Sequence, residues 1–290
     1  MTEAPLRWYH HLYVGLQYLL PHHLLARPVY GLTRVRWRPL KDLLIRVFAR
    51  HFRVDLREAL SPDPASYAHF NAFFTRELRP GARPIAGPES ALISPADGVL
   101  SQVGDIGDGR IFQAKGRDYA LLELLGGDGE RAASFQGGRF ATIYLSPRDY
   151  HRVHMPLAGR LREMVHVPGR LFSVNPVTTR LVPRLFARNE RVLCLFEGPV
   201  GPMAVILVGA IFVGGIETVW HGEVTPRRDL LTAVRYDEPA VRLDKGAELG
   251  RFNMGSTVIL LFPPGKVSWD AHRLPGSKVR MGDRLGALIG

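Results

Sequence analysis

The sequence predicts an α+β protein, in which N-terminal amphipathic helices are followed by a mainly antiparallel β sandwich or barrel-like core. Apolar residues recur at helical spacing up to about residue 80. Beyond that point, short runs rich in Val, Ile, Phe and Tyr alternate with Gly, Pro and Asp, as strands alternate with turns. Helical segments grouped ahead of strands indicate an α+β fold. We therefore expect a helical region at 1–80 and a β-rich core at 81–290.

The composition is that of a folded protein with an anionic partner. Of the 290 residues, 46% are hydrophobic, which argues against disorder over most of the length. Cys194 is the single cysteine, so no internal disulfide can form, which favours a reducing compartment. Its apolar neighbours predict that it is a core residue. The net charge of +11 favours binding either to nucleic acid or to a membrane surface rich in acidic lipids.

The first 60 residues favour the membrane surface. They hold ten Lys and Arg against four Asp and Glu, so they carry +6 of the net charge. Residues 8–26 lack a formal charge but include His, Gln and Pro, which makes them a poor membrane-spanning helix. Glu3 ahead of them argues against a signal peptide.

Leucines and tyrosines at helical spacing in this region predict an amphipathic helix that lies flat at the lipid headgroup layer. The alternative is a helix that covers the protein's own core. The residues of the stripe are Tyr9, Leu12, Tyr13, Leu16, Leu19 and Leu20.

Two further amphipathic patterns precede the strands. The first runs over 40–52 and the second over 61–78, where Phe70, Phe73 and Phe74 share a face. The turn-rich sequence RPGARP then ends helical character. Strands are expected at seven short apolar runs, which are 91–93, 98–103, 139–145, 192–196, 203–209, 219–224 and 257–262.

Three short segments carry groups suited to catalysis. SPADG at 94–98 displays Asp97 on a tight turn, YHRVHMP at 150–156 holds two histidines three positions apart, and GRFNMGST at 250–257 places a serine before a strand. Alone, each has an ordinary explanation as a turn or a hydrogen-bonding residue. A metal site at the histidines is not favoured, because no third ligand or cysteine pattern completes it.

In combination, an Asp, a His and a Ser on turns beside strands are the parts of an orienting group, a base and a nucleophile. Ser256 lacks the Gly-x-Ser-x-Gly elbow of ordinary hydrolases. Gly255 precedes it instead, and glycine removes steric bulk beside its carbonyl and permits unusual φ values. This arrangement suits attack of Ser256 Oγ on the Gly255 carbonyl, which would cut the chain between the two residues.

Seven stretches of the sequence carry a resemblance to a known family. They are FFTREL at 73–78, SPADG at 94–98, YHRVH at 150–154, LFSVN at 171–175, FARNER at 186–191, IETVW at 216–220 and GRFNMGSTVI at 250–259. In these stretches and in their order the chain resembles the bacterial phosphatidylserine decarboxylase proenzymes, which are pyruvoyl-dependent. One departure is Met254, where leucine is more usual, and this exchange conserves volume.

The resemblance implies how the chain processes itself. His154 would deprotonate Ser256 Oγ, and Asp97 would orient the imidazole and stabilise its charged form. Autocatalytic serinolysis would give a large chain, 1–255, and a small chain, 256–290, whose first residue, Ser256, becomes a covalent pyruvoyl group. The fragments would stay together as a heterodimer through the strand at 257–262, and a dimer of such pairs is left open.

The resemblance also implies the reaction. The pyruvoyl ketone would form a Schiff base with the amine of phosphatidylserine and accept the electrons released with CO₂, giving phosphatidylethanolamine. His151 is the candidate acid that protonates the substrate carbon, because imidazole titrates near working pH. The alternative is that His151 only packs or orients His154. We expect a peripheral protein on the cytoplasmic face of the cell membrane, where the N-terminal helices meet anionic lipid.

Other functions stay open at this point. A Ser-His-Asp hydrolase would keep an intact chain with a reactive Ser256. A pyruvoyl decarboxylase for a different amine would process itself but leave phosphatidylserine unchanged. A nucleic-acid-binding protein would rest on charge alone, and because no binding motif is recognised, nucleic acid is not expected as a partner.

Overall fold

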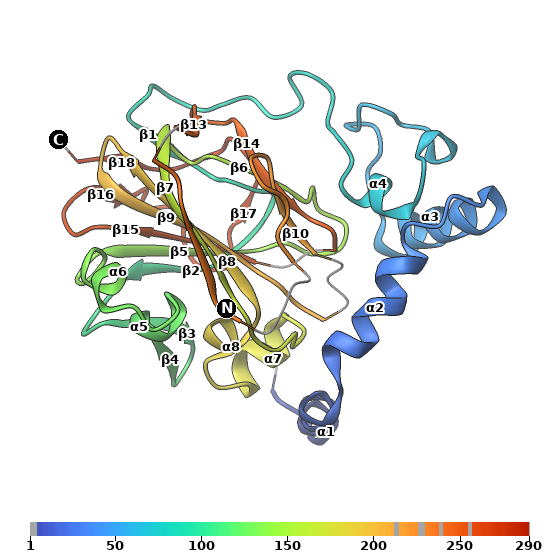
Figure 1. Cartoon of the computed structure of the whole chain (residues 1–290), viewed down its shortest axis with the longest axis horizontal. Helices are drawn as coiled ribbons and strands as arrows, with labels where there is room; N and C mark the ends of the chain where they lie inside the picture. The colour runs from blue at the N-terminus through green and yellow to red at the C-terminus, as the bar shows by residue number, and fades with distance from the viewer. Residues whose placement is uncertain (1–4, 212–214, 226–229, 238–239, 255–256, 290) are drawn as a thin grey trace.

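The computed structural model describes residues 5–211, 215–225, 230–237, 240–254 and 257–289. Figure 1 shows a β-rich body with the N-terminal helices along one side of it. These helices are α1 (Trp8–Leu19), α2 (His22–Leu32), α3 (Arg38–Phe52) and α4 (Phe70–Phe74). No helix among the described residues has the length and hydrophobicity that a membrane crossing requires. The α+β class predicted from the sequence is confirmed.

The boundary between α1 and α2 follows from a proline. Leu20 is extended, with φ −72° and ψ 135°, because the ring of Pro21 disfavours helical conformation at the residue before it. The predicted helix over 40–52 is confirmed as α3, which starts two residues earlier with Pro39 in its first turn, where a proline costs no hydrogen bond.

The helix predicted across 61–78 is wrong. Only a 3₁₀ turn at Pro64–Ser66 and the short α4 are helical there. The His69 side chain accepts a hydrogen bond from the Ala72 backbone N–H at 3.0 Å, and this cap starts α4 independently of the preceding turn. The apolar pattern still reports burial correctly, since the three phenylalanines of α4 pack with Ile45 of α3.

A nine-stranded antiparallel sheet forms the centre of the body. Its strands lie in the order β12-β7-β8-β9-β15-β5-β2-β17, and β13 also pairs with β7. They are β2 (Gly98–Asp105), β5 (Arg139–Tyr144), β7 (Gly159–Val167), β8 (Arg191–Gly198), β9 (Gly201–Val208), β12 (Thr232–Arg235), β13 (Arg242–Leu243), β15 (Thr257–Phe262) and β17 (Lys278–Val279).

Three smaller antiparallel sheets surround the large one. One has the order β11 (Gly222–Glu223), β10 (Ile216–Thr218), β14 (Glu248–Phe252) and β6 (Arg152–His154). A second has the order β1 (Ala91–Ile93), β18 (Arg284–Leu288) and β16 (Val267–Trp269), and a third pairs β3 (Arg110–Ala114) with β4 (Arg117–Ala120). Four short helices complete the fold, which are α5 (Leu121–Leu124), α6 (Gly129–Ala133), α7 (Pro176–Leu181) and α8 (Leu185–Arg188).

The large sheet buries both of its faces. On one face, Val258 and Leu260 of β15 pack in a core with residues of β1, β6, β14 and β18. On the other face, Ile259 and Leu261 pack in a second core with residues of α5 and α8. Because successive side chains of a strand point to opposite faces, β15 supplies both cores and all six of its residues are buried. Cys194 of β8 lies in the first core, where burial raises the pKa of its thiol.

Six of the seven predicted strands are present, as β1, β2, β5, β8, β9 and β15. The strand predicted over 219–224 is wrong, since residues 219–221 form a turn and only the two-residue strand Gly222–Glu223 follows it. The strand Gly159–Val167 is missing from the prediction, because charged residues interrupt its apolar pattern.

Candidate active site

The bond between Gly255 and Ser256 lies outside the described residues, but both of its neighbours are placed. Met254 follows β14 of the four-stranded sheet, whereas Thr257 is the first residue of β15 in the large sheet. The predicted cleavage site therefore lies where the chain passes from one sheet to the central strand of another.

The backbone leading to this site is held and strained. The Asn253 N–H donates to Gly215 O at 2.8 Å, and the Asn71 amide donates to the Asn253 side-chain oxygen at 3.0 Å. Met254 then has φ +148°, in a region that residues with a Cβ seldom adopt. Such a conformation costs about 1–3 kcal/mol and persists only where the surroundings impose it. Strain thus accumulates one residue before the predicted cut.

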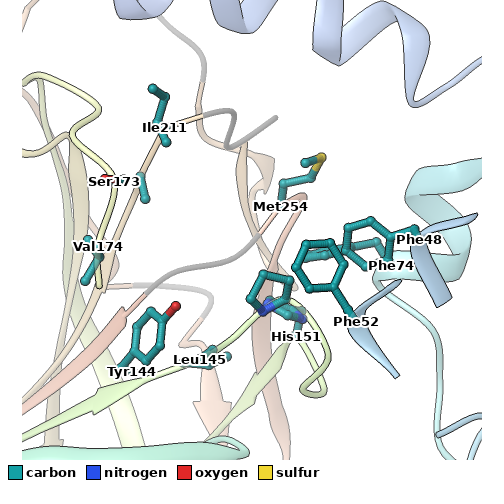
Figure 2. A pocket seen from close by; sticks show the side chains of 12 residues that line it. Phe48, Phe52, Phe74, Tyr144, Leu145, His151, Ser173, Val174, Ile211 and Met254 are labelled. Carbon is teal, nitrogen blue, oxygen red and sulfur yellow. The ribbon is translucent and has the colours of Figure 1, made fainter. Parts of the chain in front are cut away.

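Beside Met254 lies a cavity of about 250 Å³. Figure 2 shows that α3 and α4 contribute phenylalanines to it, while Tyr144 and Leu145 come from the end of β5 and its loop. Nearly all the lining is apolar, and His151 is the one histidine in it. The lining residues are Phe48, Phe52, Phe74, Tyr144, Leu145, Pro147, His151, Ser173, Val174, Ala210, Ile211 and Met254.

His151 lines this cavity and carries a buried acceptor. Its Nδ1 lies 2.8 Å from Asp149 O, and because a carbonyl only accepts, Nδ1 carries the proton. Nε2 therefore holds a lone pair, and it is buried without a hydrogen-bond partner among the described residues. Burial is the larger cause and the charge of Arg76 the smaller one of a shift that lowers the pKa of His151 to about 3. The reason given for an acid role, that imidazole titrates near working pH, does not hold in this structure.

His154 lies at the other end of β6 with both ring nitrogens hydrogen-bonded. Nδ1 donates to Gly246 O at 2.9 Å, so Nε2 accepts from the Tyr150 hydroxyl at 3.0 Å. Burial lowers the pKa of His154, and the nearby charge of Asp97 opposes this shift. The imidazole is thus neutral at pH 7, with its basic nitrogen covered by a phenol.

Asp97 is bound to an arginine and not to His154. Arg83 donates to both carboxylate oxygens, at 2.9 and 2.6 Å, and Met281 N–H donates to one of them at 2.9 Å. The Asp97 turn nevertheless adjoins β6, because His154 N–H donates to Pro95 O at 2.8 Å. The structure therefore brings Asp97 and His154 into neighbouring positions without the direct hydrogen bond of a triad.

The predicted residues form two groups. His151 lines the cavity beside Met254, Asp97 and His154 lie together at the far end of β6, and Gly255 and Ser256 lie outside the described residues. Sequence reasoning missed Tyr150 and Arg83, whose side chains bind these groups. Tyr150 stands inside the YHRVH stretch, which was the available signal, whereas Arg83 lies in a segment identified only as a turn.

Comparisons with known proteins agree over nearly the whole chain. A sequence model described as phosphatidylserine decarboxylase matches residues 70–287, and one described as PSD matches residues 12–53. The phosphatidylserine decarboxylase proenzyme of Azotobacter vinelandii is 59% identical over 273 residues, covering 93% of this chain and 96% of the relative. The proenzyme of Pseudomonas aeruginosa strain LESB58 is 60% identical over 277 residues, covering 94% and 96%.

A third relative, the phosphatidylserine decarboxylase proenzyme of Bordetella pertussis, is 59% identical over 278 residues, covering 94% of this chain and 93% of its own. The sequence model that matches residues 70–287 spans all three of the segments singled out for catalysis. The chain belongs to the phosphatidylserine decarboxylase family.

Proposed function

We propose that this chain is the proenzyme of a phosphatidylserine decarboxylase, which cuts itself between Gly255 and Ser256 and then converts phosphatidylserine to phosphatidylethanolamine and CO₂. Family membership is the observation that carries this proposal. Two structural features support it, namely the strained backbone at Met254 and the cavity beside it with the bare Nε2 of His151.

In the processing step, Ser256 Oγ attacks the carbonyl carbon of Gly255. His154 takes the hydroxyl proton and returns it to the leaving amide nitrogen, so that the amide becomes an ester. Loss of the Ser256 α-proton then expels the Gly255 carboxylate, and water releases ammonia to leave the ketone. The neutral state of His154 supports its role as base, and Tyr150 is the group that the incoming hydroxyl must displace or use as a relay.

Asp97 contributes to this step through its charge. A carboxylate near an imidazole favours the protonated ring that forms when His154 accepts a proton. Arg83 holds that carboxylate in place and ties it to Glu58, to which Arg83 Nη2 donates at 2.8 Å. The proposed role of Asp97 is therefore electrostatic, in place of the direct orientation that the sequence predicts.

The covalent pyruvoyl group would supply an electrophilic ketone and an electron sink for decarboxylation. The residues beside Met254 fit such a group, since they form a largely apolar cavity whose lining includes His151, and His151 Nε2 has no hydrogen-bond partner among the described residues. As a lone-pair nitrogen, His151 first accepts a proton from the substrate ammonium and then delivers it to the carbon that has lost CO₂. The acid role predicted from the sequence is thus the second of two proton transfers, and it follows the step in which His151 accepts the proton.

The N-terminal helices support a peripheral location on the cytoplasmic face of the cell membrane. Trp8, Leu16 and Leu19 of α1 are 76%, 52% and 81% exposed, although burial of such side chains is favourable. Exposed apolar residues beside a basic segment are typical of interfacial helices. α1 also covers part of the protein's own core, which was the alternative prediction for this helix, since Val14 packs in the second core.

The fragments are proposed to remain a heterodimer after the cut. β15 of the small chain pairs with β5 and β9 of the large chain, and β17 and β18 pair with β2 and β1. Outside the sheets, Arg280 contacts Glu58 at 3.2 Å. Separation would expose six fully buried β15 residues.

Intact-mass measurement of the purified protein tests the proposal. We expect two chains, 1–255 and 256–290, with the small one reactive toward hydroxylamine, and CO₂ release from phosphatidylserine vesicles. Ser256→Ala should stay full-length and inactive. An uncut, active protein would favour the hydrolase, and normal processing without phosphatidylserine turnover would favour a different amine substrate.

A second experiment tests whether His154 is the base in the processing step. His154→Ala should slow processing by at least about 10²-fold, which is the usual contribution of a general base. His166→Ala is the matched control, since His166 is also buried, with Nε2 3.0 Å from Glu190, but lies on β7. Equal processing of the two variants would remove His154 from the mechanism.

A further inference from the structure

We infer that Arg76, in the FFTREL stretch, is a positioning residue for His151: by holding the Asp149 carbonyl, it fixes the imidazole tautomer that leaves Nε2 without a proton. This inference rests on the proposed function, in which His151 handles the substrate proton. FFTREL is one of the stretches of family resemblance to which the proposed reaction assigns no chemical role. The inference stands on the contacts that join it to YHRVH.

Arg76 and His151 share one acceptor. Arg76 Nη2 donates to Arg148 O at 3.2 Å and to Asp149 O at 3.4 Å, and His151 Nδ1 donates to the same Asp149 O at 2.8 Å. A carbonyl oxygen has two lone pairs, so it can accept both donors. By fixing this carbonyl, Arg76 fixes the tautomer in which Nδ1 bears the proton and Nε2 is bare.

The loop that carries the shared carbonyl is held from its other side. Ser146 donates to the Asp149 carboxylate from both its N–H and its hydroxyl, each at 2.7 Å. The Phe74 ring lies against the imidazole, with the two ring centroids 4.0 Å apart. Arg152 binds Thr75 O at 2.9 Å, which anchors the FFTREL segment itself. The imidazole is therefore constrained by Phe74 on its face and by the loop carbonyl at Nδ1.

Burial of the Arg76 guanidinium costs more free energy than a role in packing alone would explain. It is 4% exposed, and none of the described carboxylates lies within ion-pair distance of it. Its Nε is buried without a partner. A buried charge without a counter-ion costs several kcal/mol in real proteins, which a hydrophobic residue would avoid. Its positive charge also opposes protonation of His151, so the lone pair persists until a negative group enters the cavity.

Among the described residues, few polar or charged groups lie near His151. Tyr144 of β5 lines the same cavity, α3 presents Phe48 and Phe52, and the 171–174 segment presents Ser173. Among the charged residues, the Asp149 side chain is capped by Ser146, and Arg152 is paired with Glu248 at 2.8 Å. Arg76 is thus the charge expected to control His151.

The test measures His151 directly on the uncut Ser256→Ala proenzyme, so it does not depend on activity. Ring ¹⁵N shifts, assigned through a His151→Asn comparison, report tautomer and protonation across pH. We expect a single Nδ1–H tautomer in the parent. Adding Arg76→Gln should raise the pH at which the ring protonates by about one unit, the usual effect of removing a nearby charge. An unchanged titration would overturn the inference.

The matched control is Arg191→Gln, since Arg191 is also buried and donates only to carbonyls, among them Leu124 O and Ala187 O. It should leave the His151 signal unshifted, and an equal shift in both variants would overturn the inference. Arg76→Met, which keeps the apolar stem, replaces Arg76→Gln where the latter does not fold.

Turnover of the mature enzyme gives a second readout. Arg76→Gln should move the acid limb of kcat toward higher pH by about one unit, whereas Arg76→Lys, which keeps the charge, should leave the limb in place. Normal turnover of His151→Ala would contradict the proposed function, and the ring-shift measurement would still decide the role of Arg76.

Discussion

Two imidazoles three positions apart in the chain meet different surroundings. His151 lines an apolar cavity beside Met254 and its Nε2 has no partner among the described residues, whereas His154 Nε2 is covered by Tyr150 at the other end of β6. Both rings are neutral because burial disfavours their charged forms. The separation supports a division in which His154 serves self-cleavage and His151 serves turnover.

The depressed pKa of His151 predicts a pH dependence of stability. Its folded value of about 3 lies below the ordinary 6.5, so between these values the unfolded chain binds more protons. Stability is complete above pH 6.5 and is lost as pH falls toward 3, at up to about 1.4 kcal/mol per pH unit. Urea unfolding of the Ser256→Ala proenzyme should show this slope, and adding His151→Asn should make it shallower.

The same urea-unfolding measurement can contradict the assignment of this pH dependence to His151. A slope below pH 6 that is identical with and without His151→Asn would mean that other groups carry the acid sensitivity. His166→Asn gives the comparison for a histidine whose ring lies 3.0 Å from a carboxylate, that of Glu190.

At this scale the sequence predicts residue types better than contacts. Asp97 and His154 do lie near each other, but the carboxylate binds Arg83, which no local pattern could indicate because the pairing spans 14 positions and depends on a turn. The neutral state of His151 also required the fold, since it comes from phenylalanines of α3 and α4.

Among the elements, α1 combines two functions. Gln17 accepts from Ser173 N–H at 2.8 Å, and Tyr13 lies 2.8 Å from the Ser173 hydroxyl, so one side of the helix is fastened to the segment that lines the cavity. Its other side leaves leucines in solvent. The helix therefore joins the proposed lipid surface to the proposed active site.

Disrupting the exposed side should remove membrane binding without unfolding the protein. Leu16→Asp with Leu19→Asp deletes two exposed apolar groups and adds repulsion from acidic lipid. We expect binding to vesicles of phosphatidylserine and phosphatidylethanolamine to weaken by at least about tenfold, because each buried leucine contributes roughly 1.5–3 kcal/mol. Vesicle co-sedimentation measures this.

The control pair is Leu274→Asp with Ile289→Asp, which makes the same charge change at residues 62% and 45% exposed on the β-rich body. Equal loss of binding in both pairs would show that net charge, and not α1, holds the protein on vesicles.

Element boundaries were predictable where turns enclose an apolar run. β1 and β15 were predicted to the residue for this reason. Over 61–78 the apolar spacing was right about burial but wrong about length, since His69 caps a new helix in the middle. Gly159–Val167 was missed because it meets solvent in part, and its pairing with β8 supplies the order that its own pattern lacks.

Over the whole molecule, β15 is the central connection. It pairs on both sides within the large sheet and contributes to both cores. The proposed scissile bond lies just before it, and the residues proposed to act on that bond come from β6 with its loop and from the turn between β1 and β2. Cleavage therefore requires the assembled sheets.

Leu260→Pro tests this requirement. Proline removes a ladder N–H and is found essentially only on edge strands or at bulges, so it should disrupt β15, which is paired on both sides. Although Ser256, His154 and Asp97 are all retained, we expect a full-length chain on a denaturing gel and reduced β signal by circular dichroism. Leu260→Ile keeps the N–H and the volume, and should process normally. Efficient cleavage of the proline variant would show that processing needs only local structure.

The α+β class was predictable because helical and strand patterns occupy separate parts of the chain. The order of strands was not, since β15 pairs with β5 and β9 across distances that alternation cannot specify. The contact of Asp97 with Met281 N–H, 184 positions away, has no sequence signal at all.

If the bond just before β15 breaks only in the folded protein, the timing of pyruvoyl formation has a consequence for the cell. Newly made and misfolded copies would carry an inert serine, and the electrophile would arise only inside a finished molecule, shielded from free amines. Each polypeptide would then hold one equivalent of its own prosthetic group, independent of any vitamin supply. The amount of carbonyl in a preparation would count its correctly folded molecules.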